Sequence, residues 1–383
     1  MKTFITPGKI NLGTDIFNES KKDLAKLGHK ALIVADPYLI KSGEVAKLQE
    51  VLASLNIESV IDGEIVGEPT DTMIMSGVNL YTIEHCDFLI GFGGGSPLDS
   101  MKAIGAVIVS GGDIDDYYGR EFTKKLPPMV AIPTTAGTGS EATKFTIISN
   151  TKDNIKMLLK GDTLLPDLVL IDPTFSITTP KNVTSSTGID AFCHAMESFT
   201  SRKRQPIAST LALSAVKRIY QNLLVAYKDG QNIAARNEMA IAALEAGMSF
   251  TNSSVTLIHG MSRPIGVLYH VPHGLSNAML LPTCLDFLLD GDHPGFATLG
   301  KSIGVATNQE DDKSAAMAFK HAVTKLCIDL EIPTLKEYGV NETSFMANLD
   351  KMAQDALDSG SPANSMREVN KEDIIKIYKS LWK

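Results

Sequence analysis

The sequence predicts an α/β domain with a parallel sheet, followed by an all-helical domain. Between residues 30 and 132, short β-branched runs alternate with amphipathic stretches, as in βαβ units that are buried on both faces. Beyond about residue 185, long helical patterns take over and β-branched runs become scarce. The chain has 383 residues, whereas single hydrophobic cores stop growing near about 250 to 300 residues. We therefore expect two domains, 1–184 and 185–383.

The predicted elements of the first domain follow in order along the chain. Its predicted strands are short and apolar, and lie at 30–36 (KALIVAD), 57–62 (IESVID), the start of 87–95 (DFLIGFGGG) and 129–135 (MVAIPTT). VAKLQEVLASL and PLDSMKAIGAVIV have helical spacing. In the second domain, SSTGIDAFCHAMESFTSR, PIASTLALSAVKRIYQNLLVAYK, AARNEMAIAALEAGMSF and KSAAMAFKHAVTKLCIDL predict helices. The boundary lies near PDLVLIDPTFSITTPKN, because prolines interrupt regular structure there.

The composition points to an ordinary globular protein, with 44% hydrophobic and 21% charged residues. The net charge of −8 and the lack of a dense Lys/Arg tract argue against nucleic-acid and acidic-membrane partners. No apolar run approaches the roughly 20 residues of a membrane span, and the start of the chain lacks the layout of a signal peptide. The four cysteines form no CxxC pair, which indicates reduced thiols. We expect a cytoplasmic protein with a small-molecule partner.

A glycine-rich turn follows the third predicted strand, in GFGGGSPLDSMK. In open α/β sheets, ligands bind where strands run into helices. Glycines let the backbone approach a phosphate, and the N–H groups and dipole of a helix N-terminus favour its negative charge. The alternative is a plain tight turn, since the GxGxxG pattern is not matched. The turn is therefore a candidate cofactor loop.

Two other strand ends offer polar groups to a cofactor. Asp36 ends the first strand, where a carboxylate can accept hydrogen bonds from ribose hydroxyls and repel a 2′-phosphate, which favours NAD over NADP. Alternatively, Asp36 only opens the turn Asp-Pro-Tyr. PTTAGTGSE (133–141) exposes N–H and O–H donors to an anionic or polyol ligand, or it is a solvated connection.

Candidate metal ligands lie in the second domain. Asp190 and His194 are four residues apart, so that in a helix both side chains project from one face. Either both bind the same metal ion, or they only contact each other on the surface of the helix. HGMSRPIGVLYHVPHG adds His259, His270 and His273. Three imidazoles and one carboxylate suit zinc or iron(II). Such an ion with an open position lowers the pKa of an alcohol oxygen, and with a nicotinamide in an interdomain cleft it supports reversible hydride transfer.

Several motifs together resemble the iron-activated, or group III, alcohol dehydrogenases. GGGSPLDSMK, PTTAGTGSE, LLPDLVLIDP, GIDAFCHAMES and HGM followed by VPHGLSNA occur in that family's order and approximate spacing. The family includes lactaldehyde reductases, 1,3-propanediol dehydrogenases and butanol dehydrogenases. The resemblance implies an α/β dinucleotide-binding domain and a helical metal domain, an architecture shared with dehydroquinate synthase. It also implies NAD(H), one divalent ion that is iron(II) or zinc, and a homodimer or higher homo-oligomer.

The resemblance also implies roles for individual residues. The implied metal ligands are Asp190, His194, His259 and His273. The implied cofactor-binding residues are Gly94, Gly95, Ser96 and Asp99 in the first loop, Thr134, Thr135 and Thr138 in the second loop, Lys156, and Asp36 as the acidic residue associated with NAD.

The chain departs from the family pattern near the metal. Arg263 stands where many members have a histidine assigned to proton relay, and Glu68 replaces a frequent asparagine. We hypothesise that Arg263 grips an anionic group of the substrate, because a guanidinium binds carboxylate, sulfonate or phosphonate with two hydrogen bonds. Alternatively, it pairs with a nearby carboxylate. His270 is a candidate proton acceptor, or a donor behind the ligands, or a surface residue.

These features predict a metal-dependent, NAD(H)-linked alcohol dehydrogenase or aldehyde reductase acting on a small primary alcohol or diol. The first alternative is a dehydroquinate synthase-like lyase, which also uses NAD and a metal but needs clustered basic residues for its substrate. The second is a non-catalytic protein that binds a metal or nucleotide. Phe145 and Phe250 are candidate walls of the substrate pocket.

Overall fold

The computed structural model describes residues 2–153 and 155–382. The described residues form two compact units. We call residues 5–135 and 139–176 the sheet unit, and residues 2–4, 136–138 and 177–382 the helical unit. The sequence placed the boundary at 184/185, whereas the chain leaves the sheet unit after Ser176. The reason is that the first long helix of the helical unit already begins at Lys181.

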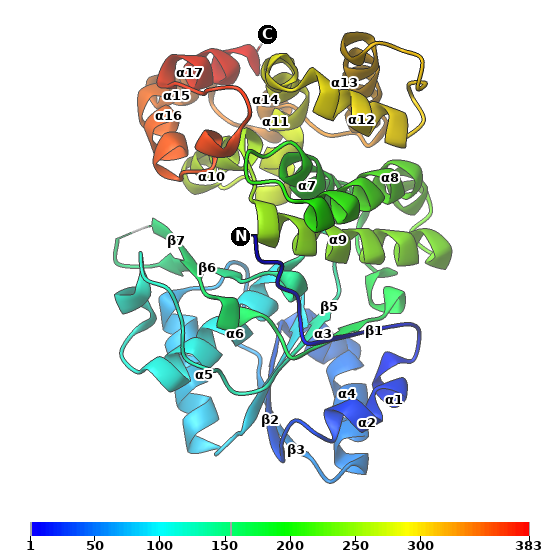
Figure 1. The fold of residues 1–383 in the computed structure, drawn as a ribbon. Coiled ribbons are helices and arrows are strands. Elements are labelled where there is room, and N and C mark those ends of the chain that lie inside the picture. Colours follow the sequence, from blue (N-terminus) through cyan, green and yellow to red (C-terminus); the bar gives the residue numbers. More distant parts are fainter. Residues whose placement is uncertain (1, 154, 383) are drawn as a thin grey trace. The chain divides into compact units, whose positions relative to one another are not determined.

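The sheet unit is built on a parallel sheet (Figure 1). Among the described residues the sheet has six strands, in the order β1-β8-β5-β4-β2-β3, and all neighbours are parallel. An antiparallel hairpin of β6 and β7 lies outside this sheet. The bounds are β1 Lys9–Leu12, β2 Lys30–Ala35, β3 Glu58–Asp62, β4 Phe88–Gly93, β5 Met129–Pro133, β6 Phe145–Asn150, β7 Ile155–Lys160 and β8 Leu168–Ile171.

Helices cover both faces of this sheet, with α1 to α4 on one face and α5 and α6 on the other (Figure 1). Successive residues of β4 point to opposite faces: Ile90 joins the core beneath α4, while Gly91 approaches Met101 of α6. Burial of both faces explains the continuous apolar strands. The bounds are α1 Ile16–Glu19, α2 Lys21–Leu24, α3 Pro37–Ser42, α4 Glu44–Ser54, α5 Asp71–Ile83 and α6 Gly95–Ser110, with 3₁₀ turns η1 Ile114–Tyr117, η2 Ser140–Ala142, η3 Asp162–Leu164 and η4 Pro173–Ser176.

The strand order contains a switch point between β2 and β4. From β2 the chain moves outward to β3 and then crosses back to β4 on the other side of β2. Ligands of open α/β sheets bind at the carboxyl ends of strands at such a point. Asp36 directly follows β2 and Gly94 directly follows β4, so the fold places both predicted cofactor residues there.

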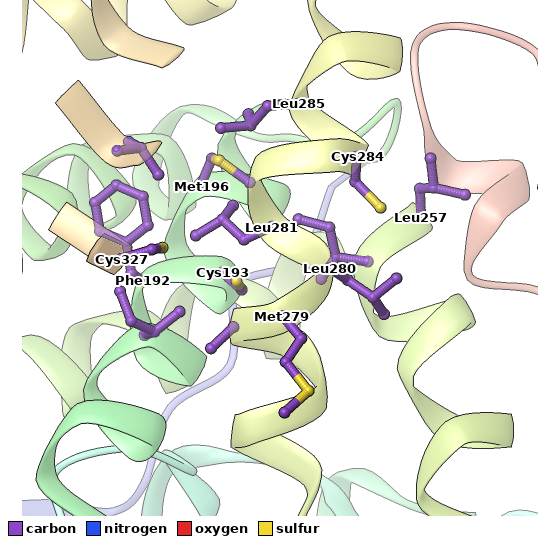
Figure 2. Packing of buried hydrophobic residues seen from close by; sticks show 14 of the residues in the cluster. Phe192, Cys193, Met196, Leu257, Met279, Leu280, Leu281, Cys284, Leu285 and Cys327 are labelled. Atoms are coloured by element: carbon purple, nitrogen blue, oxygen red, sulfur yellow. The ribbon is translucent and has the colours of Figure 1, made fainter. Parts of the chain in front are cut away.

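The helical unit packs around helix α7, which is buried along most of its length. Its core is rich in Ala, Met and Cys, and Figure 2 shows Cys193 and Met196 of α7 beside Leu281 of α11. All four cysteines are buried and free. The bounds are α7 Lys181–Phe199, α8 Pro206–Lys228, α9 Ile233–Ser253, α10 Leu257–Tyr269, α11 His273–Leu288, α12 His293–Ser302, α13 Asp312–Asp329, α14 Leu335–Tyr338, α15 Glu342–Ala347, α16 Leu349–Asp358 and α17 Lys371–Ser380, with 3₁₀ turns η5 Leu289–Gly291 and η6 Pro362–Asn364.

The predicted fold class, a parallel α/β domain followed by a helical domain, is confirmed. Within the described ranges, no helix has both the length and the apolarity that crossing a membrane requires.

Candidate functional site

Three helices of the helical unit bring four potential metal ligands together. Asp190 and His194 lie one turn apart on α7, His259 lies near the start of α10, and His273 is the first residue of α11. Their ligand atoms all lie within 4.8 Å of one another. These are the residues that the family resemblance implied as ligands.

The imidazoles converge on one carboxylate oxygen. Asp190 Oδ1 lies 3.5 Å from His259 Nε2, 3.8 Å from His273 Nε2 and 3.9 Å from His194 Nε2. The rings of His194 and His259 stack with centroids 4.5 Å apart. Each histidine therefore points the same nitrogen at the same place.

A glycine permits this convergence of helices. A Cβ atom on Gly274 would lie 2.7 Å from the carbonyl oxygen of Ser186 and 3.2 Å from Cβ of Asp190. Any side chain at this position would push the start of α11 away from α7. The absence of a side chain at Gly274 thus allows α11 to approach α7 closely enough for His273 to lie near Asp190.

Glu197 lies behind one of the imidazoles and is fully buried on α7. Its Oε1 atom accepts hydrogen bonds from Thr256 Oγ1 at 2.8 Å and from the Ile258 N–H at 2.7 Å. Its Oε2 atom pairs with Nδ1 of His259. Because the carboxylate is an acceptor, the Nδ1 atom carries the proton, and Nε2 is left as the atom that can bind a metal.

Asn277, one turn after His273 on α11, is also fully buried. Its Nδ2 atom donates to Asp190 Oδ1 at 2.6 Å and lies 3.2 Å from His259 Nε2. Its Oδ1 atom has no hydrogen-bond partner among the described residues. On the other side of the cluster, Phe250 of α9 stacks on His194 with centroids 4.2 Å apart.

Burial sets the protonation of the imidazoles. It lowers the pKa of His194 to about 4 and that of His273 to about 3, although Asp190 opposes both shifts. Burial also acts to lower the pKa of His259, but the carboxylates of Glu197 and Asp190 outweigh it and raise this pKa to about 9. Two imidazoles are therefore neutral at pH 7, and an ion must displace the proton from the third.

The donor set fits a divalent transition ion. Three imidazole nitrogens and one carboxylate oxygen in a buried cluster match the ligands of zinc and non-haem iron. The orphaned Asn277 Oδ1 atom marks a polar site whose hydrogen bonding the protein groups do not complete. The Asp190 and Glu197 carboxylates also balance the charge of a divalent cation.

The predicted cofactor residues follow neighbouring strands of the sheet unit. Gly94 is the N-cap of α6, and no side chain in the described ranges caps this end. The backbone N–H groups of the first turn of α6 are thus available to an anion such as pyrophosphate. Thr134 donates its backbone N–H to Gly93 O at 2.9 Å, and a Cβ on Gly94 would touch the Thr135 side chain at 3.5 Å. Gly94 and Thr135, one from each predicted cofactor loop, are therefore neighbours.

Asp36 opens the turn Asp-Pro-Tyr, which was the alternative interpretation of this residue. Its Oδ1 atom accepts a hydrogen bond from the Leu39 N–H at 2.9 Å and caps α3. Its Oδ2 atom lies close to Gly93, where an added Cβ would meet it at 3.3 Å. One carboxylate oxygen thus caps the helix, and the other lies toward the end of the neighbouring strand.

The other predicted cofactor residues have defined surroundings. Lys156 of β7 donates to Glu68 Oε1 at 2.6 Å, so the glutamate that departs from the family pattern holds the predicted cofactor lysine. Both carboxylate oxygens of Asp99 accept hydrogen bonds, from Ser140 Oγ at 2.5 Å and from the Ile147 N–H at 2.9 Å. Thr138 belongs to the helical unit, whereas Thr134 and Thr135 belong to the sheet unit.

The two predicted catalytic residues are not in the ligand cluster. Arg263 lies one turn after His259 on α10, is partly buried, and its charge helps to lower the pKa of His273. His270 is exposed and caps the end of α10 in a left-handed conformation with φ 53°. Its carbonyl oxygen accepts from Tyr338 Oη at 3.3 Å. Its role as proton acceptor stays a prediction.

Sequence reasoning missed Glu197 and Asn277. Their spacing is a usable signal, because Glu197 follows His194 by three residues and Asn277 follows His273 by four. Both intervals place a side chain on the ligand face of its helix. What the spacing does not reveal is the partner of each residue on another helix.

Comparison with known proteins gives the family. Residues 7–173 match the iron-containing alcohol dehydrogenases, and residues 184–382 match the C-terminal part of the Fe-containing alcohol dehydrogenase family. The chain is similar to a 1,3-propanediol dehydrogenase of Citrobacter freundii, with 36% identity over 359 residues, which cover 93% of this chain and 92% of the relative. A crystal structure of a 1,3-propanediol oxidoreductase superposes with a TM-score of 0.95 at 34% identity and covers 100% of both chains.

Two other relatives differ in the substrate that they are named for. An NAD-dependent methanol dehydrogenase of Bacillus methanolicus is 31% identical over 383 residues, covering 99% of this chain and 100% of the relative. A sulfoacetaldehyde reductase of Bilophila wadsworthia is 34% identical over 356 residues, covering 90% and 91% respectively. The matches run through both units, and they favour the dehydrogenase over the lyase and the non-catalytic alternatives. The chain therefore belongs to the iron-containing alcohol dehydrogenase family, and it is an NAD-dependent oxidoreductase of that family.

Proposed function

We propose that the protein catalyses reversible hydride transfer between NAD(H) and a small primary alcohol or diol, with one iron(II) ion held by Asp190, His194, His259 and His273. Zinc is the alternative ion, since the same donors accept both metals. The convergence of these four donors within 4.8 Å carries the proposal.

The residues around the site support this chemistry. When bound, the ion polarises the oxygen of the alcohol or aldehyde and lowers the pKa of the alcohol. His194 and His273 are neutral at pH 7 because of their burial, so they can donate lone pairs. Glu197 keeps the proton of His259 on Nδ1 and thereby frees its Nε2 atom.

The sheet unit supplies groups for NAD. The uncapped N-terminus of α6 suits the pyrophosphate. The Asp36 carboxylate at the end of β2 accepts hydrogen bonds from ribose hydroxyls and disfavours a 2′-phosphate. We therefore propose NAD as the preferred cofactor over NADP.

We further propose that Arg263 lets the enzyme act on aldehydes that carry an anionic group. Names of relatives cover both neutral and anionic substrates, as in 1,3-propanediol dehydrogenase and sulfoacetaldehyde reductase, so the family alone does not decide. Arg263 lies one turn from His259 and acts electrostatically on His273. A guanidinium so placed suits a carboxylate or sulfonate on a short chain.

An NADH-consumption assay tests the main proposal. Metal-stripped protein is reconstituted anaerobically with iron(II) or zinc and given a panel of short aldehydes, as wild type and as His273→Ala. The exposed His321 of α13 supplies the matched control, His321→Ala. We expect turnover by the wild type and the control, and its loss in His273→Ala. Turnover by the metal-free protein, or by His273→Ala at the wild-type rate, contradicts the proposal.

A further inference from the structure

Lys102 is a fully buried lysine in helix α6 of the sheet unit. A buried ammonium group is costly unless it is hydrogen-bonded. If only packing were required at this position, an apolar side chain of similar volume would serve as well or better. The presence of a lysine therefore calls for a specific role.

The Nζ atom of Lys102 is surrounded by oxygen atoms of one segment, 140–145. It donates to Ser140 O at 2.5 Å and Ser140 Oγ at 3.1 Å. Thr143 O at 2.9 Å, Thr143 Oγ1 at 3.0 Å and Phe145 O at 3.0 Å also lie within hydrogen-bond distance of Nζ. The three N–H groups of the ammonium are shared among these five oxygen atoms. The Lys102 ammonium group thus contacts carbonyl and hydroxyl oxygens at both ends of this segment. These contacts connect the segment to α6.

Asp99 makes a complementary set of contacts from the same face of α6, three residues earlier. Its carboxylate accepts from Ser140 Oγ at 2.5 Å and from the Ile147 N–H at 2.9 Å. Its backbone carbonyl accepts from Thr146 Oγ1 at 2.8 Å. The helix therefore holds the segment through one cation and one anion, and Ser140 contacts both.

The charge on Lys102 is maintained by its surroundings. Burial lowers its pKa to about 8, while the carboxylates of Asp99 and Glu141 oppose this shift. Glu141 is itself buried next to Ser140 in η2. At pH 7 the ammonium form prevails, so its charge-assisted hydrogen bonds are present.

We infer that Lys102 is a positioning residue for the cofactor, because it fixes the end of the second cofactor loop, and the residues directly after it, onto the helix that begins at the first loop. The inference rests on the proposed function. Helix α6 starts at Gly95, directly after the first predicted loop. Residues 140–145 start within the second loop (133–141) and continue past its end, and this loop is joined to the end of β4 through the hydrogen bond from the Thr134 N–H to Gly93 O. Lys102 acts on the cofactor only through the placement of these loops.

Direct binding of NADH tests this inference. Metal-free protein is titrated with NADH and followed by nucleotide fluorescence, so that the readout does not depend on turnover. Lys102→Met keeps an unbranched side chain that is one atom shorter, and it removes the ammonium group. Since displaced binding groups lose affinity steeply, we expect the NADH Kd of Lys102→Met to rise about tenfold or more. In the reconstituted enzyme, we expect the KM for NADH to rise while the KM for the aldehyde changes less than about twofold.

The matched control is Lys124→Met. Lys124 is an exposed lysine that donates to one carbonyl of the same helix, Val109 O, at 3.1 Å. We expect its NADH Kd to equal that of the wild type. Circular dichroism and the melting temperature establish that each variant is folded at the temperature of the titration.

The outcomes separate the two proposals. A folded Lys102→Met protein with the wild-type NADH Kd overturns the inference, even if its melting temperature falls. If Lys102→Met does not fold, Thr143→Val decides, because it removes one acceptor of the ammonium group. We expect its NADH Kd to rise about two- to fivefold, in keeping with the loss of one charge-assisted hydrogen bond, and an unchanged Kd overturns the inference. A wild-type protein that binds no NADH rejects the proposed function, and the inference with it.

Discussion

The Nδ1 atom of His259 is hydrogen-bonded to the carboxylate of Glu197, while its Nε2 atom faces Asp190 Oδ1 at 3.5 Å. Both carboxylates lie on α7, which also carries His194. One helix therefore supplies two of the proposed metal ligands and the group that orients a third. The backbone N–H of Ile258 and the hydroxyl of Thr256 hold Glu197 in place, so the orientation of His259 is built into the junction of α7 and α10.

Glu197→Gln tests this relationship. A glutamine amide can donate to Nδ1, which would leave the proton on Nε2 and block metal binding. We expect the affinity for zinc or cobalt(II) to fall by about 10- to 100-fold, as is common when a group that orients a histidine ligand is removed. Competition titration with a chromogenic chelator measures this affinity.

Glu245→Gln is the control for that experiment. Glu245 lies on α9 in the same unit, accepts from Ser214 Oγ at 2.9 Å and pairs with Arg218 at 3.4 Å. We expect its metal affinity to match that of the wild type. Equal affinities in all three proteins contradict the role of Glu197.

Arg263→Ala tests the proposed ion pair between Arg263 and the anionic group of a substrate. We compare kcat/KM for a neutral and an acidic aldehyde of equal length, in wild type and variant. A bidentate charge-assisted contact is worth about 1.5 to 3 kcal/mol. We expect kcat/KM for the acidic aldehyde to fall at least about tenfold relative to the neutral one, since each 1.4 kcal/mol corresponds to tenfold. An unchanged ratio between the two aldehydes contradicts a contact between Arg263 and the anionic group of the substrate.

Asp36→Asn tests the choice of nicotinamide cofactor. Asparagine caps helices about as well as aspartate, so α3 keeps its N-cap and the melting temperature stays close to that of the wild type. The substitution removes the charge that repels a 2′-phosphate. We expect kcat/KM for NADPH, relative to NADH, to rise about tenfold. A change in stability with no change in cofactor preference shows that Asp36 serves only the turn.

Glu141 predicts a pH dependence of stability. Burial raises the pKa of its carboxyl to about 7 from the usual 4.5. Between these values the folded protein binds more protons at this group than the unfolded chain does. The stabilisation is therefore complete below pH 4.5 and is lost as the pH rises through 7.

Glu141→Gln removes this titration. Chemical denaturation at pH 5 and at pH 8 measures the free energy of unfolding of both proteins. We expect the free-energy difference between wild type and variant to shift by about 2 to 3 kcal/mol against the wild type from pH 5 to pH 8, which is most of what the pKa shift corresponds to. A parallel pH dependence in the two proteins rejects the assignment.

The parallel sheet was predictable because most of its strands are short apolar runs that can be recognised in the sequence without knowledge of their partners. The predicted strand 30–36 corresponds to Lys30–Ala35, and 57–62 corresponds to Glu58–Asp62. Strand β8, Leu168–Ile171, was not predicted, although it lies between β1 and β5. Four apolar residues between Pro166 and Pro173 resemble a linker, and only their pairing with distant strands makes them part of the sheet.

The site was predictable where its residues are close in sequence. Asp190 and His194 show the four-residue spacing of one helix face. Lys102 gives no such signal, since a lysine in an amphipathic helix is usually exposed. Its burial depends on Ser140 and Thr143, about forty residues later in the chain. Glu197 does show the three-residue spacing from His194, but its partner His259 lies on another helix, so the sequence does not reveal which ligand it orients.

The central claim is that one ion, held by Asp190, His194, His259 and His273, is required for NADH-linked turnover. The most direct measurement is a stoichiometric titration of metal-stripped protein with iron(II) under anaerobic conditions, followed by the rate of NADH oxidation with a short aldehyde. We predict that activity rises linearly and stops rising at one ion per chain. Activity without added metal, or activity that keeps rising well beyond one ion per chain, contradicts the claim.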